Sequence, residues 1–297
     1  VVLGDYDSLY TWSTANGLVK LIESPNGMTG ATGISESGDT VVVTGFAYDV
    51  SGSGQYEGGT VVIKDGVEAF YPSTEFSNGL SFQMVLSNDG EFLGGRNLIT
   101  AQPATLNLST GAMTDYPNAV GATIITALSD NGDVKALKAG FWNASWHILS
   151  NDSPLQLSSI SVNGFSSNGD LAFGSKSGCA SNPTNPFETC LASFNRHTDE
   201  VIELGDFRPV SYATNGQLVT GVNPDDNQAT VVWDPVNGMR LIEDVLASNG
   251  VATGWTGVSV NSVSPDGTKI VGKGTNPLGL IRGYLFEVIQ ECSTPAF

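Results

Sequence analysis

Residues 229–274 read ATVVWDPVNGMRLIEDVLASNGVATGWTGVSVNSVSPDGTKIVGKG, and this stretch decides the fold prediction. Four apolar strands are expected in it, at residues 230–233, 239–242, 258–263 and 268–272. Asp-Pro-Val-Asn-Gly separates the first pair, and Ser-Pro-Asp-Gly separates the second. These sequences favour tight turns, because glycine adopts positive φ at little cost and Asn or Asp tolerates it. The stretch therefore predicts one four-stranded antiparallel sheet.

The turn before the last of these strands recurs along the chain. Its copies begin with serine, or once with alanine, and end with glycine, at residues 35–38, 87–90, 129–132, 166–169, 213–216 and 264–267. A repeat of this length is typical of propellers and solenoids, since one unit cannot bury both faces of its own sheet. Four strands per unit favour the β-propeller.

The ends of the chain bear on the number of blades. Six full units fit between Leu9 and Gly274, and residues 1–4 and 283–288 resemble single strands of further units. We therefore predict an all-β protein with one β-propeller domain over residues 1–297. Seven four-stranded antiparallel blades are favoured over six, with the ring closed by both termini. The chain begins inside an apolar stretch, so we expect the N-terminal part of the first blade to be missing.

One copy of the repeat combines Val232-Trp233, Gly238-Met239, residues 263–267 and Ile270-Val271-Gly272. With these elements the units resemble the HAF-repeat family of secreted bacterial proteins, and this copy matches the family pattern best. Lys135-Ala136-Leu137 departs from the Val-Val-Gly strand of that pattern. The resemblance implies an extracellular, propeller-like protein. It implies no set of catalytic residues.

Composition limits the choice of partners. The chain has 30 acidic and 12 basic residues and a net charge of −18, so it repels phosphate backbones and anionic lipids. Nucleic acid and membrane surfaces are therefore not expected partners. No apolar stretch of about 18 residues occurs, so no membrane insertion is predicted.

Two of the three cysteines flank a loop rich in Pro and Asn. A Cys179–Cys190 disulfide that staples the insertion 179–190 is favoured over two unrelated thiols, and it implies an oxidising compartment. Cys292 is left over. We accordingly expect a protein that is secreted or held at the cell surface.

Candidate ligand-binding residues are acidic or aromatic. Asp5 and Asp7, and Asp225 and Asp226, are hard oxygen ligands that suit calcium, although a plain acidic turn is the favoured interpretation of each pair. Trp142 and Trp255 lie near strand ends, where tryptophan stacks on sugars or fills the core. For Trp12 and Trp233, which recur at one unit position, the core is favoured. Three Asn-x-Ser/Thr sequons would be glycan sites in a eukaryotic host, at Asn107, Asn143 and Asn151.

No catalytic set is predicted. His147 and His197 lack partners at metal-ligand spacing, and no nucleophile elbow occurs. We therefore predict a binding or scaffold propeller that recognises a glycan or an extracellular protein, or associates with itself. The alternative is a polysaccharide-cleaving enzyme with two carboxylates near the propeller axis. Its candidates are Asp5, Asp7, Glu68, Glu200, Glu203, Asp225, Asp226, Glu243 and Asp244.

Overall fold

The structure is a computed structural model that describes most of the chain. The described residues are 2–4, 8–13, 17–23, 31–35, 37, 39–48, 57–72, 76–77, 84–117, 121–139, 145–150, 153–157, 160–166, 168–179, 189–213, 218–223, 229–249, 254–264 and 266–287. Of some of these, chiefly 2–32 and 44–57, the backbone alone is described. The chain divides into two compact units, Val1–Ser158 and Ser159–Phe297, and each is treated by itself.

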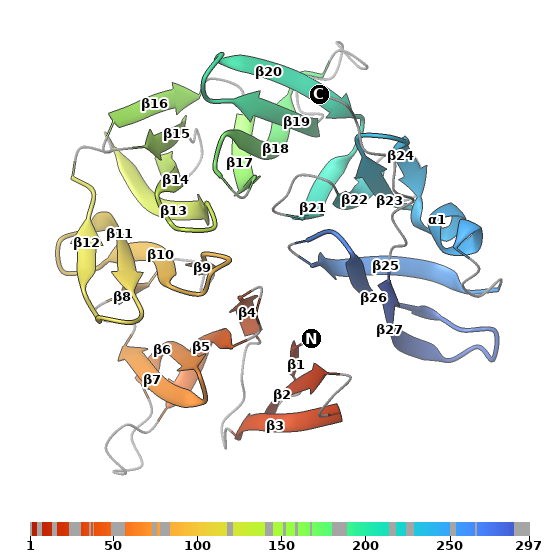
Figure 1. Ribbon diagram of the computed structural model, residues 1–297, viewed down its shortest axis with the longest axis horizontal. Helices are drawn as coiled ribbons and strands as arrows, with labels where there is room; N and C mark the ends of the chain where they lie inside the picture. Colours follow the sequence, from red (N-terminus) through yellow and green to blue (C-terminus); the bar gives the residue numbers. More distant parts are fainter. Residues whose placement is uncertain are drawn as a thin grey trace. The chain divides into compact units, whose positions relative to one another are not determined.

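The first unit consists of antiparallel sheets that follow one another along the chain (Figure 1). The sheets are β1(Val2–Gly4)-β2(Ser8–Ser13)-β3(Gly17–Glu23), β4(Ala31–Ile34)-β5(Thr40–Tyr48)-β6(Glu57–Lys64)-β7(Val67–Pro72), β12(Met113–Asp115)-β11(Gln102–Asn107)-β10(Phe92–Asn97)-β8(Phe76–Ser77) with β9(Val85–Leu86) also on β10, and β13(Ala122–Leu128)-β14(Val134–Ala139)-β15(Ser145–Ser150)-β16(Ser153–Leu157).

The second unit continues the pattern and adds a helix. Its sheets are β17(Ile160–Phe165)-β18(Leu171–Ser177)-β19(Thr189–Asn195)-β20(Glu200–Gly205), β21(Arg208–Tyr212)-β22(Val219–Asn223)-β23(Ala229–Asp234)-β24(Gly238–Leu241) and β25(Thr256–Val263)-β26(Lys269–Thr275)-β27(Ile281–Glu287). The prediction of an all-β class is thereby confirmed, and that of four-stranded antiparallel units is confirmed for most sheets, while the first and last sheets have three strands and the sheet of β8–β12 has five.

The prediction that residues 229–274 form one sheet is wrong. β23 and β24 are the last two strands of one sheet, whereas β25 and β26 are the first two strands of the next. The long connection between β24 and β25 separates the pairs, and it holds the unpredicted helix α1 (Ile242–Ser248). The helix forms because Ile242, Val245 and Leu246 lie on one face and are buried against the core.

Packing between successive sheets forms the core inside each unit. In the first unit, Val42 and Val62 of one sheet cluster with Leu93 and Leu106 of the next, and all four are almost completely buried. Trp233 is also buried, in a cluster with Leu191 and Phe207, so its predicted place in the core is confirmed. The side chain of Trp12 lies outside the described residues.

The repeated Ser-x-x-Gly turn joins the first two strands of a sheet. Ser129 shows its geometry: its Oγ accepts a hydrogen bond from Val134 N at 3.0 Å, and its own N–H bonds to Val134 O at 2.9 Å. The same side-chain bond is made by Ser35, Ser87, Ser166 and Ser264, each to the residue five positions ahead. Gly132 ends the turn at φ 72°, a conformation that favours glycine. The serine is therefore a structural residue of the turn.

A glycine within the second strand of some sheets is explained by the close approach of the neighbouring backbone, and not by a positive φ as in the turn. A Cβ at Gly174 would lie 1.9 Å from Ser161 O, and one at Gly272 would lie 2.0 Å from Ser259 O. In both sheets a β-bulge of the first strand lies beside the glycine, which brings that strand's backbone close. Val43 and Leu137 stand at this position in two sheets of the first unit, so the glycine is not required in every sheet.

Candidate functional site

Antiparallel pairing gives each sheet two chemically different ends. The turns between its first and second strands and between its third and fourth strands lie at one end, which we call the turn end. The connection between the second and third strands, and the one that leads to the next sheet, lie at the other end, which we call the loop end. The turns repeat in sequence, whereas the loop-end connections differ from one sheet to the next.

The turn ends of neighbouring sheets are tied together in the first unit. Asn88 Nδ2 donates a hydrogen bond to Asp130 Oδ1 at 2.8 Å, and Asp89 N donates to Asp130 O at 3.2 Å. Lys64 forms an ion pair with Glu91, which also accepts a hydrogen bond from Ser109. These bonds from Lys64 and Ser109 hold the pKa of Glu91 below its usual range. Hydrogen bonds and an ion pair therefore connect the turn ends of neighbouring sheets in the first unit.

Most of the predicted site residues fall on loop-end connections. Residues 224–228, with Asp225 and Asp226, lie between β22 and β23, whereas residues 5–7, with Asp5 and Asp7, lie between β1 and β2 of the three-stranded first sheet, to which the definition of the two ends is not applied. Trp142 and Asn143 lie between β14 and β15. All of these residues lie outside the described parts of the chain, so the calcium and sugar-stacking hypotheses for them stay predictions.

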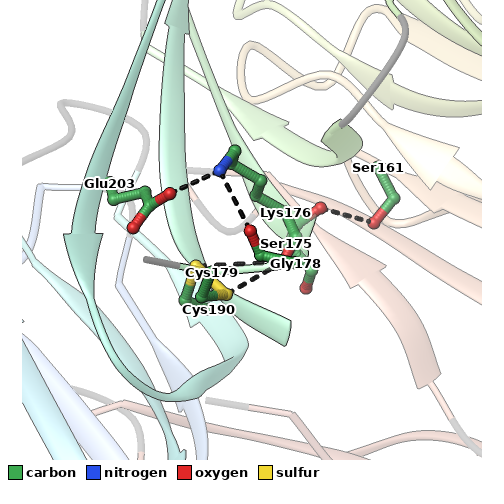
Figure 2. The surroundings of a disulfide bond; sticks show 7 residues. All are labelled: Ser161, Ser175, Lys176, Gly178, Cys179, Cys190 and Glu203. Carbon is green, nitrogen blue, oxygen red and sulfur yellow. Dashed lines mark hydrogen bonds and ion pairs between the residues drawn. A yellow bond between two sulfur atoms is a disulfide. The ribbon is translucent and has the colours of Figure 1, made fainter. Parts of the chain in front are cut away.

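The Cys179–Cys190 disulfide is present and confirms the prediction (Figure 2). It joins the start of the β18–β19 connection to β19, with a Cα–Cα distance of 6.0 Å. Both cysteines are buried, and their sulfur atoms lie 3.3 Å and 3.8 Å from Lys176 O. The disulfide therefore fixes both ends of residues 180–188 at the loop end of this sheet.

A charged pair lies beside the disulfide. Lys176 Nζ of β18 forms an ion pair with Glu203 of β20, across the intervening strand β19 (Figure 2). Lys176 Nζ also donates to Gly178 O at 3.5 Å, and Ser161 Oγ donates to Ser175 O at 3.2 Å. Nothing in the sequence marks Lys176 and Glu203 as partners, because only the sheet brings them together.

Trp255 lies at the loop end, just before β25. Its ring meets the ring of Tyr284 edge to face, with centroids 6.2 Å apart, and it packs against the core cluster of Val232, Ile270 and Phe286. Burial raises the pKa of Tyr284, whose hydroxyl donates to Ser259 O at 3.1 Å. Trp255 is half-buried at the margin of this core.

The histidines and carboxylates form no recognisable catalytic set within the described residues. His147 is buried in β15, while Glu68, Glu200, Glu243 and Asp244 are exposed. Glu203 is paired with Lys176, as described above. Among the described residues, no group of three or more His, Cys, Asp or Glu side chains is placed to hold a metal ion.

A second charged cluster lies at the turn end of the β17–β20 sheet. Asp170 Oδ1 lies 2.7 Å from His197 Nε2, and it accepts a hydrogen bond from Arg196 Nη2 at 2.9 Å. The bonds from His197 and Arg196 hold the pKa of Asp170 below its usual range. The side chain of His197 is exposed, and the sequence did not reveal its carboxylate partner.

One predicted glycan acceptor can be examined. Asn107 lies at the turn end, where its side-chain oxygen accepts hydrogen bonds from Ser109 N at 3.1 Å and Thr110 N at 2.9 Å. It therefore shapes the β11–β12 turn. Asn143 and Asn151 lie outside the described residues. In the described parts of the chain, no helix is long and apolar enough to cross a membrane.

No protein-family model and no curated protein matches the chain. Solved structures that resemble it are β-propellers. The β-propeller domain of the Trilobed protease from Pyrococcus furiosus, described as an open velcro topology, has a TM-score of 0.54 and 11% identity over 88% of this chain and 80% of its own. The Cps50 (Swd1) β-propeller domain from Myceliophteria thermophila has a TM-score of 0.53 and 12% identity, over 97% and 93%.

Longer proteins also resemble the chain over one part of their length. Acylaminoacyl peptidase from Pyrococcus horikoshii has a TM-score of 0.54 and 14% identity, over 84% of this chain and 43% of its own. The chain likewise spans 49% of dipeptidyl peptidase 4 from Porphyromonas gingivalis. At these identities the likeness shows the fold alone: the chain has the β-propeller fold, built of antiparallel sheets.

Proposed function

We propose that the chain is a secreted binding or scaffold propeller whose loop-end connections recognise a glycan or an extracellular protein, or associate with further copies of the chain. The single observation that carries this proposal is the contrast between the two ends of the sheets. The turn ends repeat one bonded pattern, whereas the loop ends vary in length and chemistry. Binding residues are commonly found on variable loops that a rigid scaffold positions.

The disulfide supports secretion and recognition together. Disulfides persist in oxidising compartments, and this one fixes a loop rather than two core strands. Holding residues 180–188 at both ends lowers the entropy that they lose when a partner binds. Trp142 and the half-buried Trp255 would supply stacking surfaces for a sugar. Asp5, Asp7, Asp225 and Asp226 would supply oxygen ligands if calcium takes part.

A glycan array and a sizing measurement test the proposal, each run in calcium and in chelator. Leu278→Ser and Val236→Ser form a matched pair, because both residues are exposed apolar side chains in tight turns, with exposed fractions of 81% and 63%. Leu278 lies at a loop end and Val236 at a turn end. We expect Trp142→Ala and Leu278→Ser to weaken binding or self-association, and Val236→Ser to leave it unchanged.

Two outcomes would contradict the proposal. One is a strict monomer without any ligand in calcium and in chelator. The other is binding that fails in the Val236→Ser variant and survives in both loop-end variants. Turnover of a polysaccharide by the purified protein would favour the enzyme alternative instead.

We also propose that the blades number seven and that strands near both termini close the ring. The three-stranded first and last sheets motivate this, because each is one strand short of its neighbours. A crystal structure of the intact protein tests both points. Six blades, or a ring that stays open, would overturn this part and leave the binding proposal in place.

A further inference from the structure

Arg96 is a half-buried cation whose charge is not balanced by a neighbour. It lies on β10, and its Nε atom is buried and has no hydrogen-bond partner. Among the described residues, no acid forms an ion pair with its guanidinium group. The Nε atom of Arg240 is buried as well, but Nη2 of that residue is paired with Asp234. Arg96 is therefore unusual in a chain with 30 acidic and only 12 basic residues.

Arg96 lies near the loop end of the interface between two sheets of the first unit. A Cβ at Gly94 would lie 2.8 Å from Ile125 of β13, so this face of β10 is turned toward the next sheet. Because side chains alternate along a strand, Arg96 belongs to the same face, two residues nearer to the β10–β11 connection. At the loop end of the facing sheet, Ala122 of β13 pairs with Ala139 of β14, and both are buried. Their methyl groups offer no acceptor to a guanidinium group.

The sheet that carries Arg96 leaves its charge unpaired as well. The residues opposite Arg96 in the adjoining strands are Pro103 of β11 and Ser77 of β8. The acid of the outer strand, Asp115, accepts a hydrogen bond from Asn97 Nδ2 at 2.9 Å. Asn97 Oδ1 also accepts hydrogen bonds from the backbone of the β10–β11 connection, which holds this end of the strand in place. The described part of the sheet therefore supplies no charge partner for Arg96.

The next sheet carries a cation at the same position, and that cation has a partner. Arg96 and Lys138 occupy equivalent positions, because each lies four residues beyond the carbonyl group that accepts the N–H of the turn serine. Lys138 Nζ lies 5.8 Å from the centroid of the Trp146 ring on the adjoining strand β15, an arrangement that stabilises the charge. The described residues provide no such aromatic group for Arg96.

A carboxylate is the ligand group that matches this site best. A guanidinium group presents a planar fork of N–H donors, which binds a carboxylate through two parallel hydrogen bonds. A buried donor without a partner costs free energy, and a bound carboxylate would remove this cost for Arg96. A chain with a net charge of −18 also repels a multiply charged anion more strongly than a single carboxylate.

We propose that Arg96 binds the carboxylate of an acidic sugar, such as a uronic acid, in a glycan held at the loop end. An extended peptide fits less well, since β10 is paired with β11 on one side and with β8 and β9 on the other, and leaves no strand edge for a peptide backbone. The inference deepens the binding function proposed above and rests on it. It narrows the ligand to an acidic glycan and adds a residue that no sequence pattern marked.

A glycan array with matched members tests the ligand class on the whole protein. Oligosaccharides that contain uronic acid are compared with the same compounds after reduction of the carboxyl group to an alcohol, and with sulfated neutral analogues. Titration calorimetry then measures the affinity of the ligands that bind. We expect reduction of the carboxyl group to weaken binding at least about tenfold, because the charge-assisted hydrogen bonds are lost. The sulfated analogues should also bind more weakly than the carboxylated ones.

Two substitutions of Arg96 separate ligand binding from folding. Arg96→Met removes the charge and all donors but keeps a long side chain. It should weaken binding at least about tenfold and raise the denaturant midpoint of the free protein, because an unpaired buried donor disappears. Arg96→Lys keeps the charge without the planar fork and should weaken binding about threefold. Lys138→Met is the matched control, which should leave binding unchanged and should not raise the midpoint.

Three outcomes would overturn the inference. A lower midpoint for Arg96→Met would mean that an acid of the same chain, such as Glu75 outside the described residues, already pairs with Arg96. Equal binding of reduced or sulfated glycans, or binding of acidic peptides in their place, would show that the ligand class is wrong. Binding of carboxylated glycans that survives in Arg96→Met would show that the residue is wrong.

The proposed function fails or stands separately. If a glycan binds and Trp142→Ala or Leu278→Ser weakens its binding while Arg96→Met does not, the proposed function is retained and the inference about Arg96 is lost. If the protein binds no glycan and no protein and stays a strict monomer, both are contradicted.

Discussion

The two ends of each sheet differ in how their structure is held. At the turn end, one serine hydroxyl and one glycine build the same turn in sheet after sheet, and side chains such as Asn88 bind the turn of the next sheet. At the loop end, a disulfide, a helix and connections of different length replace the common pattern. This difference indicates that one repeated turn structure maintains the scaffold, while the loop-end connections can vary in length and sequence.

The largest expected effect comes from the loop end. Replacing both Cys179 and Cys190 with serine should lower the free energy of unfolding by about 3 kcal/mol, because a closed loop of this length restricts the unfolded chain. Denaturant unfolding measures the change. Cys292→Ser removes the remaining cysteine and should stay within about 0.5 kcal/mol. An unchanged unfolding midpoint in the double variant would show that the disulfide does not stabilise the fold.

A smaller loss is expected at the turn end. Ser129→Ala should cost about 1 to 2 kcal/mol, because the buried Val134 N–H loses its side-chain acceptor. Ser262→Ala is the matched control, since this serine is exposed on β25 and makes one long bond of 3.5 Å. Equal effects of the two substitutions would contradict a structural role for the repeated serine.

At one copy of the turn, a substitution is expected to raise the free energy of unfolding instead of lowering it. Ala213 stands where the other copies have serine, yet its N–H still bonds to Leu218 O at 2.7 Å. Ala213→Ser should therefore raise the free energy of unfolding by about 0.5 to 1 kcal/mol, through a new bond to Leu218 N. Ala213→Cys, with a similar volume and a weak acceptor, should give no such gain. A serine variant less stable than the parent protein would show that this turn differs from the others.

The smallest effect is pH-dependent and belongs to the turn end. Since the pKa of Asp170 is lowered in the folded state, its ionised form stabilises the fold above the usual Asp pKa, and this contribution is lost as pH falls through the folded value. Asp170→Asn should therefore lower the melting temperature slightly at pH 7, and the difference should shrink as pH falls below about 4 and vanish below the folded pKa of Asp170. Asp199→Asn is the control, because it removes a nearby charge at a residue whose positive φ Asn tolerates. A difference for Asp170→Asn that persists at low pH would contradict the ion-pair explanation.

The sequence predicted the elements better than their grouping. Apolar runs bounded by Asn-Gly, Asp-Gly or Ser-x-x-Gly gave most strands, because those turns act over a few residues. The same signals left open which strands share a sheet, and residues 229–274 were grouped wrongly. The helix α1 was missed because its apolar residues Ile242, Val245 and Leu246 span a single short segment without a capping side chain.

The candidate site was predicted only in part. Cys179 and Cys190 could be paired from their spacing around one loop, and the structure confirms the bond. Lys176 and Glu203, and likewise Asp170 and His197, carry no local signal, because each pair is joined only across strands of a sheet. Because the two residues of each pair are far apart in the sequence, inspection of neighbouring residues cannot reveal these contacts.

The amino-acid sequence by itself determined the repeated turns, the all-β class and the disulfide, since each depends on residues close together along the chain. Tertiary structure alone decided which strands share a sheet and which charges meet, as Lys176 and Glu203 do. The physical reason is that pairing and burial depend on neighbours that are distant in sequence, whose arrangement no single turn specifies.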